Sequence, residues 1–82
     1  MKTLIKNDTK TSLYLFEDSE AVDIQEDKVV IGNPARLIID DLDSSNASLI
    51  EGVTEPTEWV GYKYFYDDGW VSNSNYATFM LD

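Results

Sequence analysis

The 82-residue sequence contains neither cysteine nor histidine. Without cysteine the chain has no disulfide bond, no thiolate nucleophile and no cysteine-based zinc or iron–sulfur site. Without histidine it has no imidazole base, which excludes Ser-His-Asp and Cys-His catalysis and the usual zinc and haem ligands. The chemistry that remains belongs to carboxylates, lysine, tyrosine and hydroxyl groups. We therefore expect a protein that has no cofactor and is not an enzyme.

Basic residues are scarce: the sequence has six Lys and Arg but sixteen Asp and Glu, and its formal net charge is −10. Because such a surface repels a phosphate backbone, we expect no direct binding to nucleic acid. The hydrophobic content of 43% is too high for an acidic disordered tail. A chain of this length has room for one hydrophobic core. These features predict a single domain over residues 1–82.

Long apolar runs are missing as well. The first apolar pair, Leu4 and Ile5, is followed closely by Asn7 and Asp8, which leaves it far short of the apolar segment of a signal peptide. No run approaches the roughly 20 residues that span a bilayer. We therefore expect a protein made in a cytoplasm, with no secretory signal and no membrane contact.

The pattern that is present is that of short β-strands. Apolar or alternating runs are separated by turn-forming residues, and no window of twelve residues has uninterrupted helical spacing. The runs cover residues 4–5, 12–16, 21–24, 28–31, 35–40, 47–50, 59–66 and 70–71. A last run, residues 76–81, fits either a further strand or a short C-terminal turn, and we favour the strand. About seven short strands predict an all-β fold, a small antiparallel β-sandwich or β-barrel.

Two hairpins are expected within this pattern. Residues 21–24 and 28–31 flank the turn Gln25-Glu26-Asp27. Residues 59–66 and 70–71 flank Asp67-Asp68-Gly69, where Asp-Gly supplies the positive φ of a tight turn. In a strand that starts at residue 59, alternation places the tyrosines at 62, 64 and 66 on one face.

Aromatic residues concentrate in the second hairpin, which holds six of the ten in the chain. Flat rings with a polar tip suit a contact surface, either for a protein partner or for the stacking of a sugar ring. The alternative is cross-strand packing in a sheet without disulfides. The candidate contact surface consists of Trp59, Tyr62, Tyr64, Tyr66 and Trp70. A small carbohydrate-binding module is therefore the first alternative to a protein-binding function.

An acidic turn contains Asp40, Asp41 and Asp43. Aligned with a helix–loop–helix calcium loop from Asp41, it has Asn46 in place of the required glycine and Gly52 in place of the bidentate glutamate. The pattern favours a plain turn in which the Asp side chain bonds its own backbone. We assign no metal site to it.

Charge is unevenly distributed along the chain. The first ten residues hold Lys2, Lys6 and Lys10 against Asp8, while the remaining 72 hold three basic and fifteen acidic residues. This segregation predicts either a head-to-tail contact between identical subunits or lysines that protect an edge strand from aggregation. A further alternative is that the acidic body mimics DNA and inhibits a host DNA-binding protein.

Several segments resemble a group of small acidic proteins encoded by tailed phages of marine bacteria. They are residues 1–9, residues 12–18, Ile31-Gly32-Asn33-Pro34-Ala35, and residues 61–67 with Gly69-Trp70. The resemblance extends to about residue 73 and carries over no functional residue. It implies a virion accessory part, such as a tail or neck component, that contacts other virion proteins or copies of itself. The expected function is therefore that of a non-enzymatic structural or assembly protein.

Overall fold

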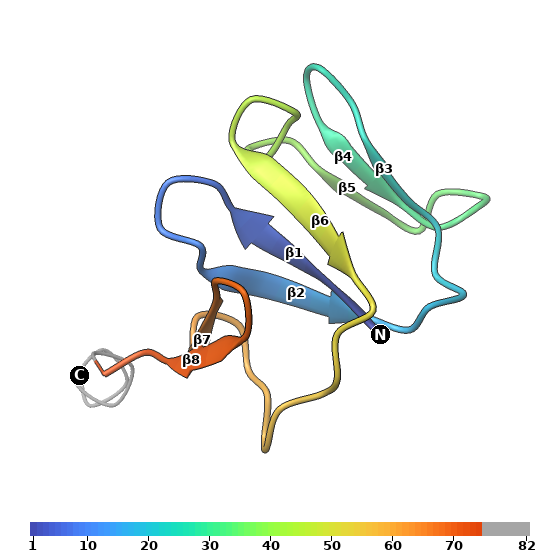
Figure 1. Ribbon diagram of the computed structural model, residues 1–82. Coiled ribbons are helices and arrows are strands. Elements are labelled where there is room, and N and C mark those ends of the chain that lie inside the picture. Colours follow the sequence, from blue (N-terminus) through green and yellow to red (C-terminus); the bar gives the residue numbers. More distant parts are fainter. Residues whose placement is uncertain (75–82) are drawn as a thin grey trace, which may run out of the picture.

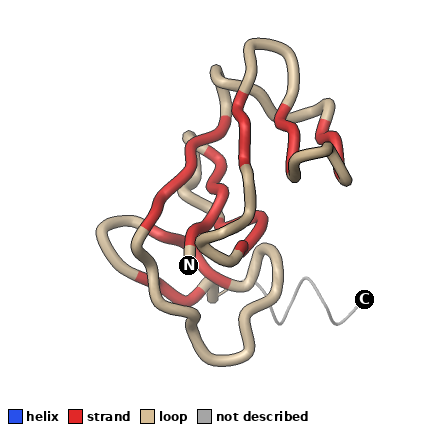
Figure 2. Tube along the Cα trace, turned by 90° about the vertical axis from the view of Figure 1, so that its right-hand side faces the viewer, coloured by secondary structure: helices blue, strands red, loops and turns tan. Residues whose placement is uncertain are grey.

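The computed structural model describes residues 1–74, and this part of the chain is built from short antiparallel strands (Figure 1). The strands are β1 Lys2–Lys6, β2 Ser12–Phe16, β3 Val22–Ile24, β4 Val29–Ile31, β5 Leu37–Ile39, β6 Ala47–Glu51, β7 Tyr64–Tyr66 and β8 Trp70–Ser72. Figure 2 shows strands and loops only over these residues. The all-β prediction is confirmed. The strand expected over residues 76–81 lies outside the described residues.

The strands form three small sheets with the orders β2-β1-β6, β3-β4-β5 and β7-β8. The first two sheets lie face to face, with β3 against β6 on one side. On the opposite side β2 and β5 are edge strands of their respective sheets. The sequence predicted either a β-sandwich or a β-barrel, and the two facing sheets form a small β-sandwich. Within residues 1–74 we find no helix that could cross a membrane.

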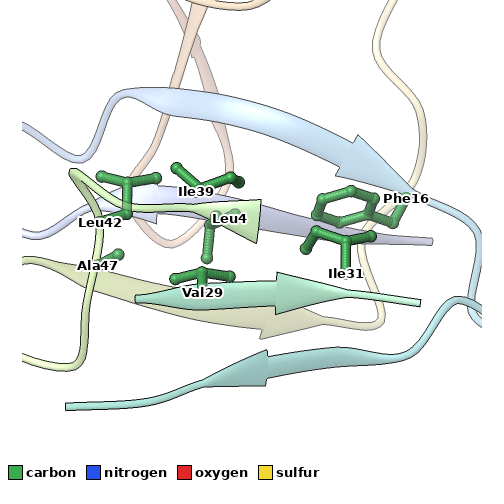
Figure 3. Packing of buried hydrophobic residues seen from close by; sticks show 7 residues of the cluster. All are labelled: Leu4, Phe16, Val29, Ile31, Ile39, Leu42 and Ala47. Carbon is green, nitrogen blue, oxygen red and sulfur yellow. The ribbon is translucent and has the colours of Figure 1, made fainter. Parts of the chain in front are cut away.

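The hydrophobic core fills the space between these two sheets (Figure 3). Val29 and Ile31 of the central strand β4 are fully buried and point toward the first sheet, whereas Val30 between them faces the other way. This alternation is the two-residue period of a strand with one buried face. The buried cluster consists of Leu4, Phe16, Val29, Ile31, Ile39, Leu42 and Ala47.

Strand β1 is buried on both of its faces. Leu4 points into the core, while Thr3 and Ile5 lie on the opposite face and are also buried. The aromatic hairpin covers that second face: Thr11, next to β2, forms a β-bridge with Phe65 of β7, and the Trp59 side chain reaches Ser12 of β2. Neighbouring residues in a strand point to opposite faces, so Leu4 packs in the core between the two sheets while Ile5 packs on the side covered by the aromatic hairpin.

The predicted hairpins are both present. β3 pairs with β4 around residues 25–28, and the Gln25 N–H donates to the Lys28 carbonyl oxygen (2.8 Å). β7 pairs with β8, with Tyr66 opposite Trp70. Asp68 and Gly69 adopt φ angles of 57° and 139°, as the Asp-Gly turn requires.

The strand expected over residues 59–66 is wrong in its first half, because β7 begins only at Tyr64. Glu58 and Tyr62 have φ angles of 51° and 73°, in the left-handed region that interrupts a strand. The Tyr62 N–H instead donates to the Ser12 carbonyl oxygen (3.0 Å), which docks the 58–63 turn on the edge of β2. A single row of the three tyrosines is therefore not formed.

Candidate functional site: the aromatic hairpin and two adjoining hollows

Three of the five candidate aromatic residues form one cluster on the β7–β8 hairpin. Trp70 meets Tyr66 at a centroid distance of 4.9 Å and an interplanar angle of 81°, and it meets Tyr64 at 5.8 Å and 69°. These are edge-to-face contacts, the geometry that the charge distribution of aromatic rings favours. All three side chains are half-buried. The cluster therefore uses its rings mainly to hold the hairpin together.

The polar ends of these aromatic side chains bind neighbouring segments. The Trp70 indole N–H donates to the Thr54 carbonyl oxygen (2.6 Å), and the Tyr64 hydroxyl donates to that of Thr57 (2.7 Å). The Trp59 indole N–H donates to Ser12 Oγ (2.9 Å). The tryptophans and Tyr64 thus fasten the 52–59 loop and the hairpin to the first sheet. This arrangement supports the packing interpretation of the aromatic residues.

Tyr62 is the exception, with 56% of its surface exposed. It projects from the 58–63 turn next to Gly61, where a Cβ atom would lie only 3.1 Å from the Leu13 carbonyl oxygen. This close approach seats the turn on β2. Alternation in the sequence predicted Tyr62, Tyr64 and Tyr66 on one face of a strand, but in the structure Tyr62 lies on the 58–63 turn, apart from the other two on β7.

A hollow of about 160 Å³ lies beside Tyr62 on the side of the sandwich where β2 and β5 are the edge strands. Its lining is apolar and aromatic apart from one carboxylate. It consists of Leu13, Tyr14, Ile39, Asp41, Leu42 and Tyr62. We call it the β2–β5 hollow. The sequence does not reveal it, because its residues come from three distant segments and no local pattern links them.

A second hollow of about 270 Å³ lies at the turn end of the aromatic hairpin. It combines an apolar floor with charges of both signs. It is lined by Ile5, Lys10, Ile50, Tyr66, Asp67 and Asp68. Of the candidate aromatic residues, Tyr66 lines this hollow and Tyr62 lines the other. The expected contact surface is thus divided between two sites.

The acidic turn adopts the self-bonded form that its sequence favours. Asp43 Oδ1 accepts hydrogen bonds from the Ser45 N–H (2.9 Å) and from the Ser45 hydroxyl, and Asn46 Oδ1 accepts one from the Asp43 N–H (2.9 Å). Asp43 therefore uses its carboxylate within its own turn. Within residues 1–74 we find no group of three acidic residues placed to hold a metal ion.

These bonds lower the pKa of Asp43 below its ordinary value of 3.8, chiefly through the Ser45 hydroxyl and then the Ser45 N–H. Because the folded pKa is lowered, the turn gains stability above the unfolded pKa and loses it as the pH falls through the folded pKa. We expect Ser45→Ala to raise the Asp43 pKa toward 3.8, measured by NMR titration of the carboxyl carbon. Ser44→Ala is the control, since no Ser44 hydroxyl bond to Asp43 is found in the described residues. An unchanged Asp43 pKa in Ser45→Ala would contradict this account.

No protein-family model, curated protein or solved structure matches the chain. The function therefore has to follow from the geometry of the exposed residues. The rings of Tyr64, Tyr66 and Trp70 pack against one another, whereas the exposed Tyr62 lines the β2–β5 hollow.

Proposed function

We propose that this protein is a non-enzymatic structural protein that assembles with itself through the side of the sandwich between β2 and β5. The observation that supports this proposal is the apolar surface exposed there. Tyr62 on the 58–63 turn is 56% exposed and Leu37 on β5 is 38% exposed. Ile38, which pairs with Val30 on the outer face of the second sheet, is 53% exposed. Large apolar side chains exposed on β5 and on the 58–63 turn of a small, highly charged protein mark a candidate interaction surface.

The backbone on this side also favours a protein partner. Among the described strands β5 pairs with β4 alone, so within residues 1–74 its outer edge offers unpaired N–H and C=O groups. An extended segment of a second molecule can add to such an edge, with its side chains packing on Leu37 and Ile38. Edge backbone and exposed apolar side chains together are the elements of a strand-pairing contact.

Sugar stacking is less well supported by the same geometry. A sugar platform needs the open face of an aromatic ring, whereas Tyr64, Tyr66 and Trp70 are half-buried and packed edge to face. The resemblance of residues 1–73 to small phage proteins adds a biological setting to the proposal, that of a virion accessory part contacting itself or other virion proteins.

Sedimentation velocity of the purified chain over a range of concentrations tests the proposal. We expect wild type to associate and Ile38→Lys to weaken association at least about tenfold, because a charge would be buried at the contact. Thr57→Lys is the control: it adds the same charge at an exposed position of the 52–59 loop and is expected to leave association unchanged. A wild-type chain that stays monomeric at every concentration would overturn the proposal.

A further inference from the structure

We propose that the self-contact is head-to-tail, with a lysine from the β1–β2 turn of one copy seated in the β2–β5 hollow of the next. This inference rests on the proposed self-assembly and specifies its geometry. The two participating surfaces are different parts of the same chain, so the contact is heterologous. Repetition of such a contact produces a ring or a filament rather than a closed two-fold dimer.

The β2–β5 hollow has the size and the chemistry for one long cationic side chain. Its volume of about 160 Å³ equals about five water molecules at ~30 Å³ each. This is below the ~300–1,000 Å³ of ordinary small-molecule pockets. Leu13, Ile39 and Leu42 offer an apolar surface on which the four-carbon stem of a lysine can lie.

The charged end of the hollow completes the match. Asp41 is its single carboxylate, and Tyr14 and Tyr62 add ring surfaces. An ammonium group beside a carboxylate and over a tyrosine ring gains both an ion pair and a cation–π contact. Tyr62 has a left-handed backbone conformation (φ 73°), and its exposed side chain is part of the lining of the hollow.

The β1–β2 turn, which spans residues 6–11 from the last residue of β1 to the residue before β2, carries two lysines that form no ion pair within residues 1–74. Lys6 and Lys10 are exposed, and in residues 1–74 no carboxylate lies within 4.0 Å of either ammonium group. Lys28, Arg36 and Lys63, by contrast, each form an ion pair. Lys10 lines the second hollow near Asp67 and Asp68 without forming an ion pair with them.

The turn is also well ordered by its own backbone. The Lys10 N–H donates to the Lys6 carbonyl oxygen (2.8 Å), and the Lys6 N–H donates to that of Thr11 (3.0 Å). In Figure 1 the turn projects beyond the end of the first sheet. A projecting, hydrogen-bonded turn whose ammonium groups form no ion pair within residues 1–74 is suited to entering a concave acidic site, at little loss of backbone entropy.

Charge segregation supports this pairing over a symmetric one. The first ten residues carry two positive charges in excess, whereas the remaining 72 carry twelve negative charges in excess. Two copies repel each other as whole molecules, but the Debye length is about 8 Å at 0.15 M salt and about 30 Å at 0.01 M. Because the molecule is 36 Å long, distant acids are screened at 0.15 M while a lysine and a carboxylate in contact still attract.

This balance predicts a maximum in the salt dependence of association. At 0.01 M the net repulsion acts over nearly the whole molecule, and at 1 M, where the Debye length is about 3 Å, the lysine–carboxylate pair is itself weakened. We expect association to be strongest near about 0.15 M salt, measured by sedimentation velocity. Association that rises steadily up to 1 M would indicate a purely apolar contact and would overturn the lysine–hollow pairing.

Charge reversal tests the pairing directly. We expect the double variant Lys6→Glu/Lys10→Glu and the variant Asp41→Lys each to associate at least about tenfold more weakly than wild type. An equimolar mixture of the two should regain association. The native lysines of the second variant meet Asp41 of the first, and the introduced glutamates of the first meet the introduced lysine at position 41.

The control is Glu55→Lys, which changes the charge equally on the exposed 52–59 loop and should associate like wild type. Circular dichroism checks that each variant is folded, as expected because every replaced side chain is exposed. If wild type is monomeric, the proposed function itself fails. If wild type associates but the reversal variants match it, or their mixture gains nothing, self-assembly stands and the head-to-tail pairing is overturned.

Discussion

Replacing Leu4 with alanine is expected to lower the free energy of unfolding by about 2–5 kcal/mol. Leu4 is fully buried at the centre of the core and lies opposite Val29 in Figure 3. Truncating its side chain removes apolar contacts with both sheets and leaves a cavity that the neighbouring strands fill only in part. Small domains are stable by only about 5–15 kcal/mol, so the loss would be a large share of the total.

Urea denaturation followed by circular dichroism measures this effect. The matched control is Val60→Ala, because Val60 is 46% exposed on the 58–63 turn and its truncation should change stability by no more than about 0.5 kcal/mol. If Leu4→Ala cost as little as Val60→Ala, the core between the two sheets would not be the main source of stability.

Ser12→Ala is expected to lower the free energy of unfolding by about 1–3 kcal/mol, although it removes a single oxygen atom. Ser12 is fully buried and its Oγ accepts the Trp59 indole N–H (2.9 Å). Thr3 Oγ1 donates to the Tyr14 carbonyl oxygen (2.8 Å), so in the 2.7 Å contact between the two hydroxyls Ser12 is the donor. The alanine variant leaves the indole N–H without an acceptor.

A second measurement separates this mechanism from a general loss of packing. The indole N–H resonance of Trp59 should shift in Ser12→Ala, while that of Trp70, bonded to the Thr54 carbonyl oxygen, should stay in place. Ser48→Ala is the matched control, because Ser48 lies on the other side of Ile5 from Ser12. Its hydroxyl donates to Oδ1 of Asn7 (2.5 Å), a half-buried residue. An unmoved Trp59 resonance in Ser12→Ala would contradict the proposed network.

The candidate site was only partly accessible from the sequence. The Asp-Gly turn and the clustering of aromatic residues led to Tyr64, Tyr66 and Trp70, which do lie together. Strict alternation failed at Tyr62, because a hydrogen bond to the edge of β2 holds its backbone in the left-handed region. No local sequence pattern predicts such a hydrogen bond, because its acceptor, the Ser12 carbonyl oxygen, lies fifty positions earlier in the chain.

Short sequence patterns were sufficient to predict the positions of most strands. Alternation in residues 21–24, the β-branched run that follows and the turn residues between runs all predicted the strands and hairpins that are observed. These features depend on φ/ψ preferences and side-chain direction over a few residues, which the sequence encodes directly. Composition by itself likewise excluded thiolate and imidazole chemistry, because the chain contains no cysteine and no histidine.

Tertiary structure alone decided which faces are covered and which are left open. Leu4 and Ile5 read as one short apolar pair, yet they belong to two layers because a hairpin from residues 64–72 returns over β1 and β2. The β2–β5 hollow exists only because two edge strands and the 58–63 turn meet there. Burial and the shape of a surface arise from contacts between segments far apart in sequence, and these contacts form only when the sheets pack.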